Sequence, residues 1–396
     1  MRTCRTSFSA PAVLTLTVLA WLLAVAPARS QTSSLPAHKA MVHPGMLHSR
    51  AELEFVKARV KAGQEPWKSA WEQLRAHSTA QLSWTPKPIA HVLRGAYNRP
   101  DVGGSNLQRD ASAAYAHALQ WFITDNPAHA QKAVEILNAY ARTLKSVGEH
   151  DARLLVGMSG VHFLIAAELM RHTYSGWKPD DQKRFEDLVR GVLYPIIKDF
   201  YPTANGNWDA AMIQTMLAMG VFLDDRAIFN RAVDYYLKGE GNGAIQKYFN
   251  DFGECQESGR DQAHTQMGLG YLGCAAEIAW KQGVDLYGAC DNRLALGFEY
   301  TAKYNLGLDV PYQPYRSVEG RYNYPAISPT GRGRFAPIYE RAYHHYHDRR
   351  GMEMPFTKQV LDKTRPEGWQ LHHIPWSTLM FAGLPEPSIA KPARTD

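Results

Sequence analysis

Residues 125–135, DNPAHAQKAVE, have the pattern of a short turn that leads into an amphipathic helix. Residues 224–234, DDRAIFNRAVD, repeat this pattern 99 positions further along the chain, and residues 177–181, WKPDD, resemble a third turn of the same kind. Each turn lies between long segments in which apolar residues recur with helical spacing. Recurring short turns between long helices predict antiparallel helix pairs.

Helical periodicity extends over most of the chain, and the alternating pattern of strands is nearly absent. The periodic segments are 107–124, 127–145, 154–174, 180–200, 207–222, 225–238, 261–282 and 290–304. An open solenoid of short repeats usually has a tighter period than 99 residues. We therefore predict an all-α fold, an (α/α) toroid that forms an incomplete barrel of about six to seven helical hairpins, with its loops converging at one open end.

Two long segments break the helical pattern. Residues 82–106 contain several prolines and glycines and predict a loop. Residues 306–337 contain five prolines and four glycines, together with many of the arginines and tyrosines. Because long irregular segments inside a compact chain are usually functional, the second segment is predicted to be an active-site loop.

The first thirty residues have the features of a secretory signal peptide. Arg2 and Arg5 precede an apolar run over residues 12–26, and Ala28-Arg29-Ser30 fits the small-x-small cleavage rule. We expect a signal peptide at 1–30 and a single mature domain at 31–396, exported to the periplasm or secreted. No later stretch is a run of eighteen apolar residues, so no membrane association is expected after signal cleavage.

Charge and cysteine content narrow the function classes. Loss of the three arginines in the leader lowers the formal net charge from +6 to +3, which does not indicate a nucleic-acid-binding protein. Seven arginines against three acidic residues between positions 313 and 350 instead favour an anionic polymer as partner. The three cysteines of the mature chain, Cys255, Cys274 and Cys290, allow at most one disulfide and have no C-x-x-C spacing.

Residues 253–271, GECQESGRDQAHTQMGLGY, bring many polar side chains to the start of a helix rich in small residues. Arg260 and Asp261 lie four and three positions before His264, so on a helix all three would share one face. Such a face could line a cavity. The alternative interpretation is a polar first turn capped by Ser258, with a buried core histidine.

Two further groups could take part in chemistry. Residues 205–209, NGNWD, open an apolar helix; one asparagine is expected to cap it, and the other could donate an amide hydrogen bond beside Trp208. Tyr315 and Arg316, followed by residues 319–324, EGRYNY, lie on the predicted active-site loop.

Taken together, NGNWD, ESGRDQAHTQMGLGYL, FEYTAKYNLG and the following Arg/Tyr loop resemble the alginate-lyase-domain polysaccharide lyases, most closely the branch that acts on alginate or glucuronan. The resemblance runs from residue 43 to about residue 383. It implies an (α/α) toroid whose site uses an Asn, a His, an Arg and a Tyr, which by motif are Asn207, His264, Arg316 and Tyr322. The better-known branch has adjacent Asn and His in an NNH motif; here Trp208 follows Asn207, so the histidine must come from another helix.

The implied chemistry is β-elimination, which removes the C5 proton of a 4-linked uronate. That proton is too weakly acidic unless hydrogen-bond donors screen the neighbouring carboxylate, a role for Asn207, His264 and Arg316. Tyr322 would take the proton and return one to the departing O4, and His264 is the alternative base for the C5 epimer. No metal and no organic cofactor is predicted. The predicted substrate-binding residues are Trp208, Arg260, Gln262, Tyr315, Arg321, Tyr324, Asn205 and Trp84.

Two other functions remain open at this point. A glycoside hydrolase on the same toroid would use paired carboxylates, Glu257 with Asp209 or Asp261. A non-catalytic sugar-binding protein would stack sugars on Trp84, Trp208 and Tyr315. The near-ultraviolet absorbance of a C4=C5 double bond in the products separates a lyase from both.

Overall fold

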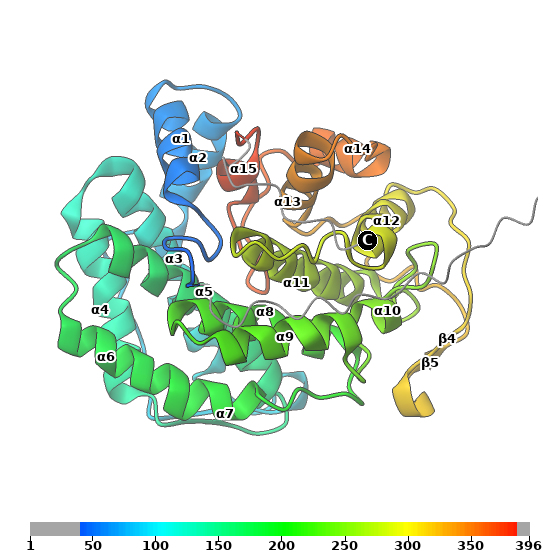
Figure 1. Cartoon of the computed structure of the whole chain (residues 1–396), viewed down its shortest axis with the longest axis horizontal. Coiled ribbons are helices and arrows are strands. Elements are labelled where there is room, and N and C mark those ends of the chain that lie inside the picture. The colour runs from blue at the N-terminus through cyan, green and yellow to red at the C-terminus, as the bar shows by residue number, and fades with distance from the viewer. Residues whose placement is uncertain (1–39, 386–396) are drawn as a thin grey trace, which may run out of the picture. The chain divides into compact units, whose positions relative to one another are not determined.

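Long helices joined by short turns make up most of residues 40–385, which are the residues that this computed structural model describes (Figure 1). The long helices are α1 (Arg50–Lys61), α2 (Trp67–Ala76), α3 (Gly104–Thr124), α4 (Pro127–Thr143), α5 (Ala152–Thr173), α6 (Pro179–Leu188), α8 (Gly206–Phe222), α9 (Arg226–Lys238), α11 (Gln262–Lys281), α12 (Ala289–Asn305) and α14 (Pro355–Thr364). The shorter ones are α7 (Tyr194–Ile197), α10 (Ile245–Tyr248), α13 (Tyr339–Tyr343) and α15 (Ser377–Phe381), and π-helical turns follow α6 at Val189–Leu193 and α13 at His344–Arg349.

Inner and outer helices differ in their apolar pattern. The inner helices α3, α5, α8 and α11 are buried over most of their length, and every residue of α8 is buried. Each packs against the next, while α4, α9 and α12 cover the inner helix that precedes them. A helix that is apolar on all sides must be enclosed, whereas an outer helix needs only one apolar stripe.

The inner layer continues from α11 through α13 and α15 to α1, and α1 packs on α3. Consecutive helix pairs therefore follow one another around a ring, and six such pairs can be followed within residues 40–385. This arrangement confirms the predicted all-α toroid.

The repeated turns have the same geometry, as their sequences predicted. Asp125 and Asp224 both adopt a left-handed conformation, with φ of 59° and 52°. The next residue then caps the outer helix: the Asn126 side chain accepts the N–H of Ala128 at 3.1 Å, and the Asp225 side chain accepts the N–H of Ile228 at 3.2 Å. These caps set where α4 and α9 begin, and hence how they fold back on α3 and α8.

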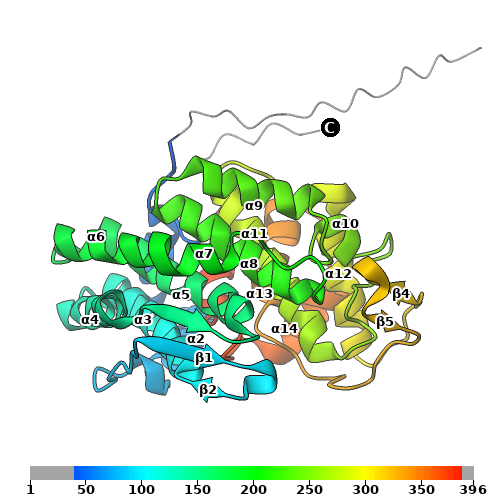
Figure 2. The same cartoon turned by 90° about the horizontal axis from the view of Figure 1, so that it is seen from below.

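The segment predicted as a loop at 82–106 contains two short strands. Strand β1 (His91–Arg94) pairs antiparallel with β2 (Asp101–Val102) and parallel with β3 (Ser146–Gly148). The sequence did not reveal them because two to four residues are too few to establish an alternating pattern. Residues 306–337 are mostly irregular, as predicted, but contain a hairpin of β4 (Tyr315–Arg316) and β5 (Asn323–Tyr324), which lies beside α10 in both views (Figure 2).

The described residues all belong to one unit, Pro36–Ala393, and the predicted signal peptide lies outside them. Within the described part, α5 is long and apolar enough to cross a membrane, but 89% of its apolar window is buried, as suits an inner helix. Cys255, Cys274 and Cys290 are free thiols.

Candidate active site

The N-terminal ends of α8 and α11 meet at the buried carboxylate of Glu257. It accepts hydrogen bonds from the backbone N–H of Asn207 at 2.9 Å, the Tyr248 hydroxyl at 3.1 Å and the Arg260 guanidinium at 2.8 Å. Burial raises the pKa of Glu257, although the charges of Arg260 and His264 oppose this. Glu257 therefore links the start of α8 to the turn that precedes α11.

Asn207 lies at this junction with an unused side-chain amide. Its Nδ2 and Oδ1 atoms are both buried and have no hydrogen-bond partner among the described residues. On α11, the Tyr271 hydroxyl is likewise buried and without a partner. Leaving a buried polar group unpaired costs about 1–3 kcal/mol, so these groups are expected to face a ligand or water.

The neighbouring Asn205 has a different role. It occupies the cap position of α8, but its side chain does not bond to the helix backbone. Its Oδ1 instead accepts hydrogen bonds from Gln256 Nε2 at 2.8 Å and from the Tyr324 hydroxyl at 3.3 Å. The sequence predicted that one asparagine caps the helix and the other is free: Asn207 is free, but Asn205 occupies the cap position without capping the helix.

His264 is held by Asp261, the N-cap of α11. One carboxylate oxygen of Asp261 accepts the backbone N–H of His264 at 2.8 Å, and the other lies 2.6 Å from His264 Nδ1. Burial raises the pKa of Asp261, but the hydrogen bonds from His264 outweigh it and hold the pKa below its usual value. With Nδ1 donating to a carboxylate, a neutral His264 carries its lone pair on Nε2, where it can accept a proton.

The structure corrects one expectation about this stretch. Arg260 was expected to share a helix face with His264, but α11 begins at Gln262 and Arg260 belongs to the preceding turn. The reason is the extended backbone of Asp261, with φ of −174°, which allows its side chain to cap the helix. Arg260 turns back to pair with Glu257 instead.

The active-site loop packs directly onto this turn at Gly259. A Cβ at Gly259 would collide with Tyr324, would lie 2.6 Å from the Tyr312 hydroxyl and would lie 2.8 Å from the Ala326 carbonyl oxygen, so only glycine allows this approach. Burial raises the pKa of Tyr324 to about 12, partly offset by the charge of Arg260. Gly259 therefore brings a tyrosine from β5 to the ends of the two inner helices.

Tyr322 and Arg316 lie in different parts of the hairpin. Tyr322 is part-buried in the bend just before β5, close enough to Tyr324 to affect the pKa of that tyrosine, and the Arg321 guanidinium lies 5.4 Å from its ring centroid. Arg316 pairs with Asn323 of β5 and is exposed. No hydrogen bond or ion pair between described residues joins Arg316 to Asn207 or His264.

Arg316 instead lines a surface groove of about 340 Å³, together with Lys247 and Asn250. Tyr315 also lines this groove and donates its hydroxyl hydrogen bond to the Lys247 carbonyl oxygen. This bond anchors the hairpin to α10. The guanidinium that the structure places beside Asn207 is that of Arg260.

Two of the predicted substrate-binding side chains are bonded within the protein. Gln262 donates to the Ser328 carbonyl oxygen at 3.0 Å and accepts from Asn305 at 3.0 Å, so it holds the active-site loop against α11 and α12. The Trp84 indole donates to Asp110 on α3 at 2.9 Å. Gln262 and Trp84 therefore hold the protein together around the site through these hydrogen bonds.

Trp208 is 9% exposed and belongs to an aromatic group at the start of α8. The His150 and Tyr201 rings each contact it edge-on, with centroids 5.5 Å away. The Arg153 guanidinium lies 4.9 Å from the centroid of the Tyr201 ring. Packed in this way, Trp208 offers little ring surface for the predicted sugar stacking, whereas the His150 side chain is exposed.

Sequence reasoning missed a polar group beside His264 formed by Arg94, Gln108 and His372. Arg94 donates to Gln108 at 2.6 Å, and Gln108 Nε2 lies 3.2 Å from His372 Nδ1. Burial lowers the pKa of His372 to about 4, and the charges of Arg94 and His264 add to this effect. These residues come from β1, α3 and the segment before α15, and none belongs to a motif that could have revealed them.

A metal site at this position is not indicated. Among the described residues, one group of three His, Cys, Asp or Glu side chains has ligand atoms close enough to share an ion, and it consists of His43, Glu168 and His172. None of these residues belongs to the group around Glu257.

Comparisons with known proteins bear on the family and the fold of the chain. A family model described as alginate lyase matches residues 75–309. No curated protein sequence matches the chain. An alginate lyase from Bacteroides ovatus superposes with a TM-score of 0.60 at 14% identity, covering 86% of this chain and 100% of that one.

Alginate lyase A1-III from Sphingomonas species A1 gives a TM-score of 0.61 at 13% identity, covering 86% of this chain and 97% of that one. A variant of alginate lyase A1-III complexed with a tetrasaccharide gives 0.62 at 15% identity, with 89% and 98% covered. At these identities the superpositions show a shared fold. Because the family model spans more than half of the sequence, the chain belongs to the alginate lyase family.

Proposed function

We propose that this protein cleaves 4-linked polyuronates, alginate or glucuronan, by β-elimination and leaves C4=C5 unsaturated uronate ends. As a member of the alginate lyase family the chain is a polysaccharide lyase, and its substrate is alginate-like. The observation that most supports β-elimination on a 4-linked polyuronate is the buried, unpaired amide of Asn207. It lies where the α8 and α11 N-termini meet, close to His264 and to Tyr324 of β5.

The first requirement of the reaction is to stabilise the charge that develops on the uronate carboxylate. The free Asn207 amide can donate to a carboxylate oxygen, and the α8 and α11 N-termini add positive potential in the same place. His264 supplies a further donor if it is protonated. Losing one donor of this kind typically lowers turnover by about a hundred- to a thousandfold.

The second requirement is proton transfer at C5 and O4. We assign it to Tyr322, which lies close to Tyr324 and has Arg321 over its ring. As a phenolate Tyr322 would remove the C5 proton, and the resulting phenol can protonate O4. Tyr324, with a pKa of about 12, keeps its proton at neutral pH and serves as a hydrogen-bond donor.

His264 is the alternative base for the epimer whose C5 proton lies on the opposite face of the sugar. Asp261 holds the proton on Nδ1, which leaves Nε2 to accept one. Arg316 is proposed to bind a uronate carboxylate along the polymer, because it is exposed on the hairpin that carries Tyr322.

The carboxylates of the hydrolase alternative are bonded within the protein. Glu257 accepts three hydrogen bonds, and both oxygens of Asp261 contact His264. Asp209 is buried and accepts from the Tyr201 N–H at 2.7 Å and the Tyr235 hydroxyl at 2.9 Å. A hydrolase needs two carboxyl groups that face the glycosidic bond, so this geometry favours the lyase.

The test is to incubate the mature chain with mannuronate-rich alginate, guluronate-rich alginate and glucuronan, without added metal. We expect near-ultraviolet absorbance to rise on at least one polymer as double bonds form. Chain cleavage that yields new reducing ends without this absorbance would identify a hydrolase. Binding without cleavage of any of the three would identify a sugar-binding protein.

We also propose that the protein is exported, on the strength of the leader-like residues 1–30, which lie outside the described part of the chain. N-terminal sequencing of the protein from its own host should begin near Gln31. Recovery of an uncleaved chain in the membrane fraction would contradict this proposal.

A further inference from the structure

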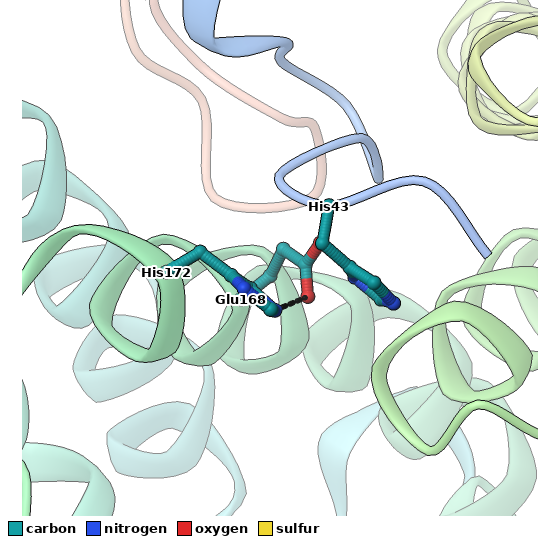
Figure 3. Close-up of side chains that lie close together, drawn as sticks. All are labelled: His43, Glu168 and His172. Atoms are coloured by element: carbon teal, nitrogen blue, oxygen red, sulfur yellow. Dashed lines mark hydrogen bonds and ion pairs between the residues drawn. The ribbon is translucent and has the colours of Figure 1, made fainter.

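The side chains of His43, Glu168 and His172 form a histidine–glutamate–histidine cluster (Figure 3). Glu168 and His172 lie near the C-terminal end of α5, and His43 comes from the segment that precedes α1. Asp224, just beyond the C-terminal end of α8, contacts the same histidine. The candidate active site lies at the other end of α8, about 25 Å away at 1.5 Å per residue.

The three side chains present a compact set of nitrogen and oxygen atoms. His43 Nδ1 lies 2.8 Å from Glu168 Oε1, and His172 Nε2 lies 3.5 Å from Glu168 Oε2. The two imidazole rings stack with centroids 4.5 Å apart, and one ligand atom from each residue lies within 4.8 Å of the others. Ligand atoms around a tetrahedral zinc ion are about 3.4 Å apart, so small adjustments would bring all three to bonding distance.

A separate observation points to a ligand at this cluster. Glu168 is 1% exposed, and its Oε2 atom faces His172 Nε2 at 3.5 Å, a long ion-pair contact without hydrogen-bond geometry. A buried carboxylate oxygen without a donor is costly. A cation between these two atoms would satisfy both.

The ring nitrogen of His43 that faces away from Glu168 contacts a carboxylate, as the second nitrogen of a metal-binding histidine usually does. His43 Nε2 lies 3.0 Å from Asp224 Oδ1 and can donate to it, and a metal ion bound at Nδ1 would replace the proton that joins Nδ1 to Glu168 Oε1. The backbone N–H of Gly45 donates to Glu168 Oε1 at 3.3 Å and helps to orient the carboxylate. A carboxylate that orients a ligand histidine in this way is usual at zinc sites.

We propose that His43 Nδ1, a Glu168 carboxylate oxygen and His172 Nε2 bind a divalent transition-metal ion, with zinc as the best match to two imidazoles and a carboxylate. The ion would join the segment before α1 to α5 and, through Asp224, to the turn after α8. Its role is structural, since the elimination takes place at the opposite ends of these helices. In the sequence only the Glu168–His172 spacing hints at the site, because His43 is 125 positions before Glu168.

The proposal is tested with the full mature chain after treatment with a chelator and dialysis. Isothermal titration with zinc should show one equivalent bound at micromolar or lower concentration, and zinc should raise Tm. Cobalt(II) should give the intense visible absorption of a four-coordinate site. Neither readout uses lyase activity, so the result is independent of the proposed function.

His172→Gln and His43→Gln should each weaken zinc binding at least a hundredfold. The matched control is His129→Gln, because the Nδ1 atoms of His129 and His117 lie 2.8 Å apart and form another close histidine pair. This variant should bind zinc like the wild type. Circular dichroism of each variant checks that it has folded.

Asp224→Asn provides a variant at an exposed position, where failure to fold is not expected. It should weaken zinc binding by about tenfold, through loss of the carboxylate that orients His43. The proposal is overturned if the wild type binds neither zinc nor cobalt at micromolar concentration, which would leave the cluster as an ion pair only. It is equally overturned if zinc binding survives both histidine substitutions, or is lost in His129→Gln.

Discussion

Proton transfer can be tested residue by residue because two tyrosines, Tyr322 and Tyr324, lie close together on one short hairpin. Tyr322→Phe deletes the proposed proton-transfer hydroxyl but keeps the ring, so kcat should fall by about two to four orders of magnitude with little change in KM. Tyr324→Phe is the matched control: it removes a donor to Asn205 and should cost about tenfold. A larger loss in Tyr324→Phe than in Tyr322→Phe would transfer the role to Tyr324.

His264 and Asp261 provide a test of which face of the sugar loses its proton. If His264 only stabilises the carboxylate, His264→Ala should lower turnover on every polyuronate. If it is the base for one C5 epimer, the loss should be selective for that epimer. The ratio of turnover on mannuronate-rich and guluronate-rich alginate distinguishes the two roles.

Asp261→Asn keeps His264 but changes the side chain that holds it, so this variant tests whether the orientation of His264 matters. Asparagine is as good a helix cap as aspartate, so α11 should keep its start. The amide can donate to Nδ1 and so favour the tautomer with the proton on Nε2, which is the wrong one for a base. We expect Asp261→Asn to show the epimer selectivity of His264→Ala while its circular dichroism spectrum is unchanged. Wild-type turnover on both epimers would exclude a positioning role for Asp261.

At the scale of elements, the turn before α11 and the β4–β5 hairpin each carry an arginine, and the two should behave differently. Arg260→Ala leaves the buried Glu257 without its cation, so the free energy of unfolding should fall by on the order of 3 kcal/mol in urea titrations. Arg316→Ala removes an exposed charge and should leave stability unchanged. It should weaken polyuronate binding instead, by a factor that shrinks at high salt. Equal effects of both substitutions on unfolding would contradict these placements.

Elements also show what the sequence could and could not predict. The inner and outer helices begin and end within a few residues of the predicted segments, because apolar periodicity and caps such as Asn126 and Asp225 are local signals. Strand β1 was missed because four residues are too few to establish an alternating pattern. Arg260 was predicted on the wrong helix face because Asp261 is extended and α11 begins only after it, so Arg260 lies outside the helix.

The candidate site was only partly predictable, because some of its residues are brought together by contacts between distant parts of the chain. Asn207 and His264 lie in recognisable motifs at helix starts, and the sequence placed both among the site residues. Arg94 and His372 join them only through the closure of the ring, which brings β1 and the segment before α15 to the end of α11. Contacts between residues so distant in the sequence leave no local pattern.

At the scale of the whole molecule, buried charges tie the first helix to the later part of the ring. Glu52 on α1, Glu277 and Lys281 on α11, and Arg349 after α13 are all nearly or fully buried, and the two cations balance the two carboxylates. Arg349 donates to both oxygens of Glu277 at 2.9 Å and lies 3.5 Å from Glu52, while Lys281 pairs with both carboxylates. Ring closure therefore depends on ions that are costly to leave unpaired.

Arg349→Met tests this dependence, because it keeps the side-chain bulk but leaves a net negative charge in the core. The free energy of unfolding at pH 7 should fall by about 3–5 kcal/mol. Arg350→Met is the matched control: its ion pair with Asp285 is part-exposed, and the loss should be within about 1 kcal/mol. Urea titrations of both variants measure the difference, and similar losses in both would show that the buried network does not hold the ring closed.

The pH dependence of that difference follows from Glu277. Burial raises its pKa, but Arg349 and Lys281 outweigh burial and hold the pKa well below the ordinary 4.5. A carboxylate whose pKa is depressed in the folded state stabilises the fold above its unfolded pKa, and this contribution is lost as the pH falls toward the folded value. The gap between wild type and Arg349→Met should therefore be constant from pH 7 to about pH 5 and shrink below pH 4.5, whereas the small effect of Arg350→Met should change little. If the difference in unfolding free energy between wild type and Arg349→Met persisted undiminished in acid, Arg349 would stabilise the toroid through packing and not through its charge. Its packing partner would be Trp280, whose ring centroid lies 5.8 Å from the guanidinium.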